Sequence, residues 1–172
     1  MAAMAANLRK MAGQEEPAFS TRAIVDACFP DAVVTGRVLP AGVHEMVTFK
    51  EGVPLIVYQR RLPAPDQRVA IAHAIGHLCL DFTAGIVCVP FNDPAVEARA
   101  DRFAAELLVP LAELEPYVGR TPDKVEDSAD AELYLDQVDE IASHFNVPAW
   151  LIDKQVRRLA LLARIAGQLC LT

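Results

Sequence analysis

Two histidines, His73 and His77, lie four residues apart in an otherwise apolar stretch of the sequence. On an α-helix this spacing puts both imidazoles on one face, one turn apart, which is the geometry that two ligands of a single metal ion need. Most residues between 68 and 81 are Val, Ala, Ile or Leu, so the helix is expected to be buried on all sides. Buried imidazoles need partners, because an unpaired polar group is costly away from water. The pair therefore predicts either a metal site or two core histidines bonded to carbonyl groups.

The residue after His73 is Ala74, so the sequence departs from the His-Glu-x-x-His motif of metallopeptidases. In that motif the glutamate is the general base. A methyl group can neither take up nor release a proton. At this position the sequence therefore supplies no base.

Two carboxylates, Glu97 and Asp101, lie on one face of a second expected helix, between residues 94 and 110. Ala104 and Leu108 share this face, which puts both acids on the stripe that points to the core. On an isolated helix such acids are usually solvated. The shared stripe instead makes them candidates for a buried polar site.

The residues between 32 and 59 predict the scaffold for these helices. Three β-branched runs alternate there with turn residues, and residues 50–53 have the character of a hairpin turn. We therefore expect a small sheet of about three strands. The histidine helix follows this sheet and is expected to begin with Asp66 as its N-cap.

Further helices are expected before and after this core. An irregular loop is expected over residues 82–92, and Asp93 with Pro94 gives the next helix the preferred start, a cap followed by Pro in the first turn. The remaining expected helices cover residues 2–12, 20–28, 133–145 and 148–166.

Composition limits the classes of function. A chain of 172 residues with 53% hydrophobic content suits one domain with a substantial core. Its net charge of −7 argues against direct binding of nucleic acid through a general basic surface, and the ten acidic and two basic residues between 113 and 140 favour a basic partner.

The sequence has no signal-peptide core and no apolar run of membrane-spanning length, so we expect a cytoplasmic protein without membrane contact. Its four scattered cysteines predict no disulfide framework.

The segment with His73 and His77 and the segment with Glu97 and Asp101 together resemble the ImmA/IrrE family of bacterial and phage metallopeptidases. Residues 50–110 carry this resemblance directly, and residues 141–148 resemble the C-terminal helical segment of the family. The matching motifs are Arg68-x-x-Ile-Ala-His73-x-Ile-Gly-His77-Leu and, twenty residues later, Glu97-x-x-Ala-Asp-x-Phe-Ala-x-x-Leu-Leu-x-Pro110.

The resemblance implies an α+β fold of the minimal zincin type, with a small sheet, a metal-binding helix and a second helix that gives a glutamate ligand. We accordingly expect an N-terminal arm over residues 1–17, a zincin-like metallopeptidase domain over residues 18–118, and a C-terminal helical segment over residues 119–172 that packs on this domain.

Carried over by position, the family pattern implies a metal held by His73, His77 and Glu97, with the fourth position left to water. Asp101 would accept the free N–H of a ligand imidazole. Two imidazoles and one carboxylate suit Zn²⁺, and they are also compatible with Mn²⁺ or Fe²⁺.

The resemblance also implies that Ala74 stands at the position of the general base, because in this family that position is a glutamate. We expect position 74 to face the open side of the metal, and we expect the chain as written to be inactive. Glu45, Asp81 or His144 could substitute in principle, but sequence spacing places none of them at the metal. Ala74 is either an inactivating replacement or the mark of a natural pseudoenzyme.

Members of this family typically cut a helix-turn-helix repressor, so the resemblance implies a repressor protein as substrate or binding partner. The alternative is a non-catalytic pseudopeptidase that binds and regulates its partner. A third hypothesis makes residues 141–165 a helix-turn-helix that contacts DNA, which the acidic surroundings disfavour.

Overall fold

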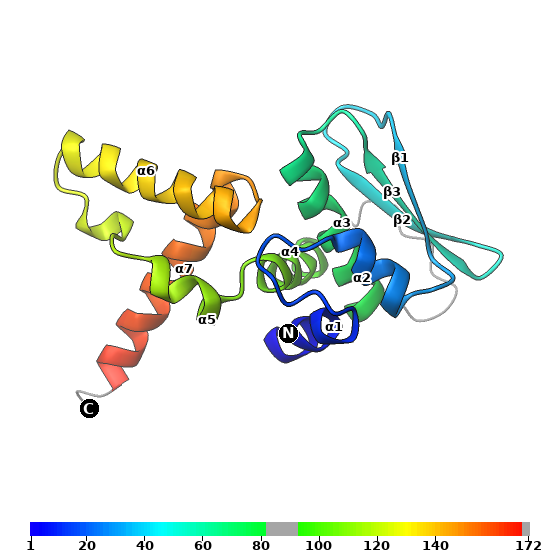
Figure 1. Cartoon of the computed structure of the whole chain (residues 1–172), viewed down its shortest axis with the longest axis horizontal. Coiled ribbons are helices and arrows are strands. Elements are labelled where there is room, and N and C mark those ends of the chain that lie inside the picture. The colour runs from blue at the N-terminus through cyan, green and yellow to red at the C-terminus, as the bar shows by residue number, and fades with distance from the viewer. Residues whose placement is uncertain (82–92, 170–172) are drawn as a thin grey trace. The chain divides into compact units, whose positions relative to one another are not determined.

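Three strands form one mixed sheet in the computed structural model of the chain, which describes residues 1–81 and 93–169. The strands are β1 (Val33–Arg37), β2 (Glu45–Lys50) and β3 (Val53–Gln59), in the order β1-β3-β2, with β3 parallel to β1 and antiparallel to β2 (Figure 1). Glu51 and Gly52, between β2 and β3, have φ angles of 55° and 82°, as a tight hairpin turn requires. The predicted three strands and their hairpin are confirmed.

An apolar row runs across the sheet. Val34, Ile56 and Val47 are neighbours on the three strands, and all three are buried. Helix α3 (Ala64–Leu80) packs on β2 and β3. Because side chains alternate between the two faces of a strand, Glu45 lies on the same face of β2 as Val47.

Helix α3 carries both histidines and is buried over residues 70–77. Its N-cap is Pro63, so the prediction of Asp66 as the N-cap is wrong. Pro65 lies in the first turn, where a residue without a backbone N–H is tolerated, and the helix therefore starts earlier than expected. Asp66 also lies in the first turn, where a carboxylate interacts favourably with the helix dipole.

Helix α4 (Pro94–Leu108) lies against α3. The carboxylate of Asp93 accepts a hydrogen bond of 2.9 Å from the backbone N–H of Ala95, which confirms the expected start. The two helices approach closely at Gly76. A Cβ atom added to Gly76 would lie 3.1 Å from both Cα and O of Ala100, so this contact needs a glycine.

Two further helices, α1 (Ala2–Met11) and α2 (Thr21–Cys28), contact each other, and α1 also packs on α4. Ser20 accepts a hydrogen bond from the backbone N–H of Ala23 and caps α2, as expected. In the segment predicted as an N-terminal arm, the buried Arg9 donates hydrogen bonds to the carbonyl oxygens of Gln14 and Glu15.

The C-terminal part is helical. It contains α5 (Leu111–Leu114), the short 3₁₀ helices η1 (Glu115–Tyr117) and η2 (Pro122–Lys124), α6 (Ser128–Phe145) and α7 (Ala149–Leu169). Helix α6 begins five residues before the predicted residue 133, because Asp127 caps it through the backbone N–H of Asp130. Asn146 ends α6 with a φ of 50°, which confirms the predicted stop.

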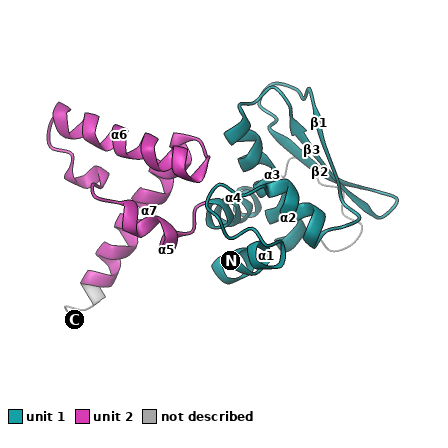
Figure 2. Ribbon diagram, in the orientation of Figure 1, with its two compact units in different colours: residues 1–108 teal, residues 109–172 magenta. Residues whose placement is uncertain are grey.

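The chain divides into two compact units, residues 1–108 and residues 109–172 (Figure 2). The sequence-based boundaries after residues 17 and 118 stay a prediction, and the expected loop over residues 82–92 lies outside the described residues. The helices and the small sheet confirm the predicted α+β class. In the described part of the chain, no helix is both long enough and apolar enough to cross a membrane.

The close contact at Gly76 yields a prediction about stability. Gly76→Val is expected to destabilise the fold by about 1 to 3 kcal/mol, because the added side chain meets the backbone of Ala100 and must push α3 and α4 apart. Urea unfolding followed by circular dichroism measures the change. The matched control is Gly167→Val in α7, where an added Cβ meets nothing within 4 Å. Equal effects of the two substitutions would contradict the role assigned to Gly76.

Candidate metal centre

Helices α3 and α4 bring together the three residues that the sequence predicts as metal ligands, His73, His77 and Glu97. Their candidate ligand atoms all lie within 4.8 Å of one another. Nε2 of His73 lies 2.9 Å from Nε2 of His77, and the Glu97 carboxylate lies 3.2 Å from the first nitrogen and 3.7 Å from the second. The α4 stripe thus points Glu97 at the two imidazoles.

A carboxylate holds the other nitrogen of each imidazole. Nδ1 of His73 lies 3.0 Å from Oδ1 of Asp101, and Nδ1 of His77 lies 3.0 Å from Oδ2 of Asp81. Because a carboxylate accepts hydrogen bonds, each Nδ1 carries the proton and donates it. Both Nε2 atoms are then left with a lone pair. The contact expected between Asp101 and a ligand imidazole is present.

The donor set fits a divalent metal ion. Two nitrogen lone pairs and a carboxylate face one another at short range, and His73 and His77 are only 8% and 5% exposed, so water does little to screen the repulsion. A cation held between these atoms removes the conflict. Two nitrogen ligands of one tetrahedral zinc ion lie about 3.3 Å apart, close to the observed separation of the two Nε2 atoms.

The two imidazoles differ in their affinity for protons. Burial lowers the pKa of His73, but the hydrogen bond to Asp101 and the charges of nearby carboxylates outweigh this effect and raise it above its usual value. Burial and the charge of His73 lower the pKa of His77, and its contact with Asp81 only partly compensates. Charging both imidazoles at once is therefore disfavoured. The neutral His77 keeps the lone pair on its Nε2 available for a metal.

Asp81 and Arg99 belong to the site, although sequence reasoning gave neither a place in it. The carboxylate of Asp81 is 4% exposed and bridges His77 to Arg99, whose Nη2 donates a hydrogen bond of 2.7 Å to Oδ1 of Asp81. Arg99 lies on α4, two residues after Glu97. The spacing of four between His77 and Asp81 was the available signal, because it places both side chains on one face of α3.

Glu45 also reaches the centre, from β2. Its Oε1 atom lies 3.8 Å from Nε2 of His73, and its side chain is 19% exposed. Burial, more than any neighbouring charge, raises the pKa of Glu45. By contrast, His144 lies in the second unit, where it stacks on Tyr117 with ring centroids 4.7 Å apart.

Ala74 is 0% exposed and lies in the buried part of α3, so the expectation that position 74 lies outside the core is wrong. The expectation that position 74 faces the metal stays a prediction. Helix α3 packs on α4 and α2 as well as on β2 and β3, and it is buried over residues 70–77. This burial agrees with the apolar character of residues 68–81, which predicts a helix that is buried on all sides.

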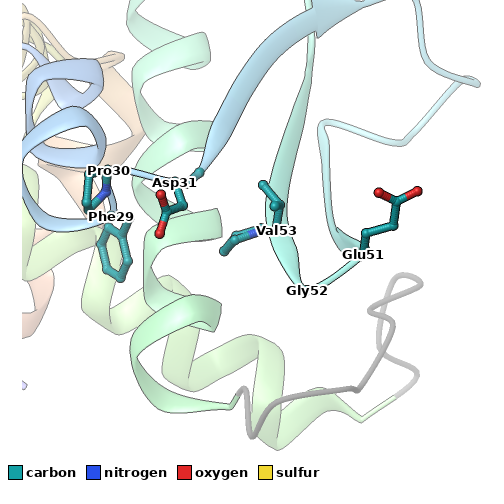
Figure 3. A pocket seen from close by; sticks show the side chains of 8 residues that line it. Phe29, Pro30, Asp31, Glu51, Gly52 and Val53 are labelled. Atoms are coloured by element: carbon teal, nitrogen blue, oxygen red, sulfur yellow. The ribbon is translucent and has the colours of Figure 1, made fainter.

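A pocket of about 480 Å³ lies elsewhere in the first unit, between residues 29–32 at the end of α2 and residues 51–54 at the β2–β3 turn (Figure 3). None of the candidate ligands lines it. The pocket is therefore separate from the histidine cluster.

Comparison with known proteins agrees with the geometry. The sequence matches the peptidase M78 family, described as the IrrE N-terminal-like domain, over residues 33–157. No curated protein and no solved structure matches the chain. The family match confirms the predicted resemblance, and the small sheet with its packed helices is consistent with the predicted zincin-like fold.

The ligand cluster predicts one bound metal ion. The wild-type chain is expected to hold about one equivalent of zinc after reconstitution, and His73→Ala, His77→Ala or Glu97→Ala is expected to abolish binding, because each removes one of three ligands. Elemental analysis measures the metal content. His144→Ala, in the second unit, is the control and is expected to keep the metal. A reconstituted wild-type protein that contains no metal would rule out the site.

The hydrogen bond between Asp101 and His73 yields a separate prediction. Asp101→Ala is expected to weaken zinc affinity by about 10- to 100-fold without unfolding the protein, because the imidazole loses the group that orients it. Competitive zinc titration measures the affinity. Asp130→Ala, which breaks a surface ion pair with Arg120, is the control. An unchanged titration would show that Asp101 does not support the metal.

Proposed function

The chain belongs to the IrrE N-terminal-like family of M78 peptidases, and on this premise we propose that it is a zinc-dependent endopeptidase directed at a helix-turn-helix repressor. The observation that carries the proposal is the pair of Nε2 atoms 2.9 Å apart, each on an imidazole whose other nitrogen is held by a carboxylate. The alternative interpretation of the pair is two core histidines bonded to carbonyl groups. Such histidines would not need two facing Nε2 atoms or a carboxylate at each Nδ1.

His73, His77 and Glu97 would hold the zinc, and Mn²⁺ or Fe²⁺ is also compatible with this set. A zinc ion in such a site polarises a peptide carbonyl and lowers the pKa of a water molecule. Asp101 and Asp81 keep the protons on the two Nδ1 atoms and so orient both imidazoles. Arg99 holds Asp81 in place from α4.

Ala74 reduces the activity that this centre supports. Losing a positioned general base costs about 10² to 10⁴ in rate, so we propose that the chain as written is inactive or very slow. The second candidate function is a pseudopeptidase that keeps the metal and controls its partner by binding. Ala74 favours this alternative because its methyl group cannot transfer a proton.

The acidic surface supports a basic partner. Glu132, Asp136, Asp139 and Glu140 are exposed on α6, and no basic residue occurs between them. A repressor that binds DNA carries a basic surface, because neutralising phosphates supplies much of its affinity. We propose that this acidic face attracts the repressor, that the chain itself contacts no DNA, and that the encounter takes place in the cytoplasm.

A direct role for residues 141–165 in DNA binding is a weaker proposal. These residues form the end of α6, the turn at Asn146 and most of α7. Leu151 and Ile152, in the first turns of α7, are buried. A recognition helix needs exposed side chains in its first turns to reach base edges, so the burial favours a packing role.

The missing base yields a test that separates enzyme from binding module. Ala74→Glu is expected to create or raise cleavage of the repressor by about 10²- to 10⁴-fold, because ligands and carboxylate supports are already assembled. Mass spectrometry of fragments, after incubation with candidate repressors encoded near the gene, measures cleavage. Ala74→Gln, similar in size but without a base, is the control, and circular dichroism checks that each variant folds at this buried position.

Cleavage that appears with Glu and not with Gln supports the peptidase. A variant Ala74→Glu that folds, holds zinc and binds the repressor but never cuts it favours the pseudopeptidase.

A further inference from the structure

We propose that Glu45 is the catalytic carboxylate that serves this centre in place of position 74. The inference rests on the proposed peptidase function and assigns its residual activity to one residue.

The carboxylate of Glu45 faces the ligand side of His73. Its Oε1 atom lies 3.8 Å from Nε2, the same nitrogen that faces His77 at 2.9 Å and Glu97 at 3.2 Å. A hydrogen bond to an N–H is about 2.7 to 3.2 Å long, so this separation is too long for Glu45 to be bonded to the imidazole. Its oxygen is therefore placed for a third group that enters the centre.

The sheet holds Glu45 in this position. Glu45 is the first residue of β2, is paired with Tyr58 of β3, and lies on the same face of β2 as the buried Val47. Helix α3, which carries His73, packs on both strands. The side chain is 19% exposed, so the carboxylate is shielded by the protein while remaining open to a water molecule or a peptide.

The other carboxylates near the imidazoles have different tasks. One oxygen of Asp81 accepts from His77 and the other from Arg99. Asp101 binds Nδ1 of His73, which is the nitrogen on the far side of the ring from Nε2. Glu97 is the third candidate ligand. Of the described carboxylates that contact His73 or His77, Glu45 is the one that faces Nε2 without belonging to the ligand set.

Hydrolysis of a peptide bond gives such a carboxylate a defined role. As the oxygen of a water molecule attacks the carbonyl carbon, Glu45 accepts one proton from that water. When the C–N bond breaks, Glu45 gives this proton to the leaving amine nitrogen, so the carboxylate is regenerated. The second proton of the water leaves with the new carboxyl group, and no other reactant is needed.

The experiment compares four forms of the full zinc-loaded chain: the wild type, Glu45→Gln, Ala74→Glu and the double variant. The substrate is a library of unstructured peptides, with fragments identified by mass spectrometry, and zinc affinity is measured by competitive titration. Glu51→Gln, an exposed residue in the turn of the same hairpin, is the matched control. Circular dichroism confirms that each variant folds.

We expect Glu45→Gln to lower the wild-type rate by at least about 100-fold while the zinc dissociation constant changes by less than about threefold. The double variant is expected to cut as Ala74→Glu does, because a base at position 74 makes Glu45 dispensable. Glu51→Gln is expected to match the wild type in both measurements.

Three outcomes would overturn the inference. Equal cleavage by Glu45→Gln and the wild type would show that Glu45 does not act in catalysis, and a loss of zinc affinity as large as that of Glu97→Ala would make it a ligand instead. Cleavage by Ala74→Glu alone, with an inactive wild type, contradicts the role of Glu45 and leaves the proposed peptidase function intact. If neither form cuts any peptide, the peptidase proposal fails and the role of Glu45 fails with it.

Discussion

Two buried imidazole nitrogens that face each other at 2.9 Å are the constraint on which the rest of the site depends. Both lone pairs point into the same space, because Asp101 and Asp81 hold the opposite nitrogens as donors. The burial of α3 fixes the two rings, and the close approach of α4 at Gly76 accompanies the placement of Glu97 beside them. These packing features bring the lone pairs of both Nε2 atoms and the carboxylate of Glu97 close together. A divalent cation would bind favourably among them.

Metal binding and proton transfer are separate tasks in this fold. The ligands and the groups that orient them come from α3 and α4, so the metal centre does not depend on the residue at position 74. That position is fully buried within α3. A chain with Ala74 can therefore keep an intact metal centre, and a carboxylate for the reacting side must come from a different element. Strand β2 presents such a group.

The sequence allowed the local features to be predicted, because helix periodicity determines which side chains share a face. His73 and His77, and likewise Glu97 and Asp101, were placed correctly on their helices for this reason. Errors arose at helix starts: α3 begins before the expected cap Asp66, and α6 begins five residues before the expected residue 133. The place of Glu45 depends on how a strand packs on a helix far along the chain. No local pattern encodes such a contact, so the sequence could not place Glu45 at the centre.

Strand β2 lies at one end of the order β1-β3-β2, and in the described residues no further strand pairs with it. An edge strand exposes backbone donors and acceptors that can recruit strands from other molecules and so nucleate aggregates. Both edge strands here end in a cation, Arg37 on β1 and Lys50 on β2. Charges at these ends disfavour the edge-to-edge pairing of two sheets, because like charges on two copies repel each other. The strand that carries Glu45 thus ends in a charge that opposes aggregation through the sheet edge.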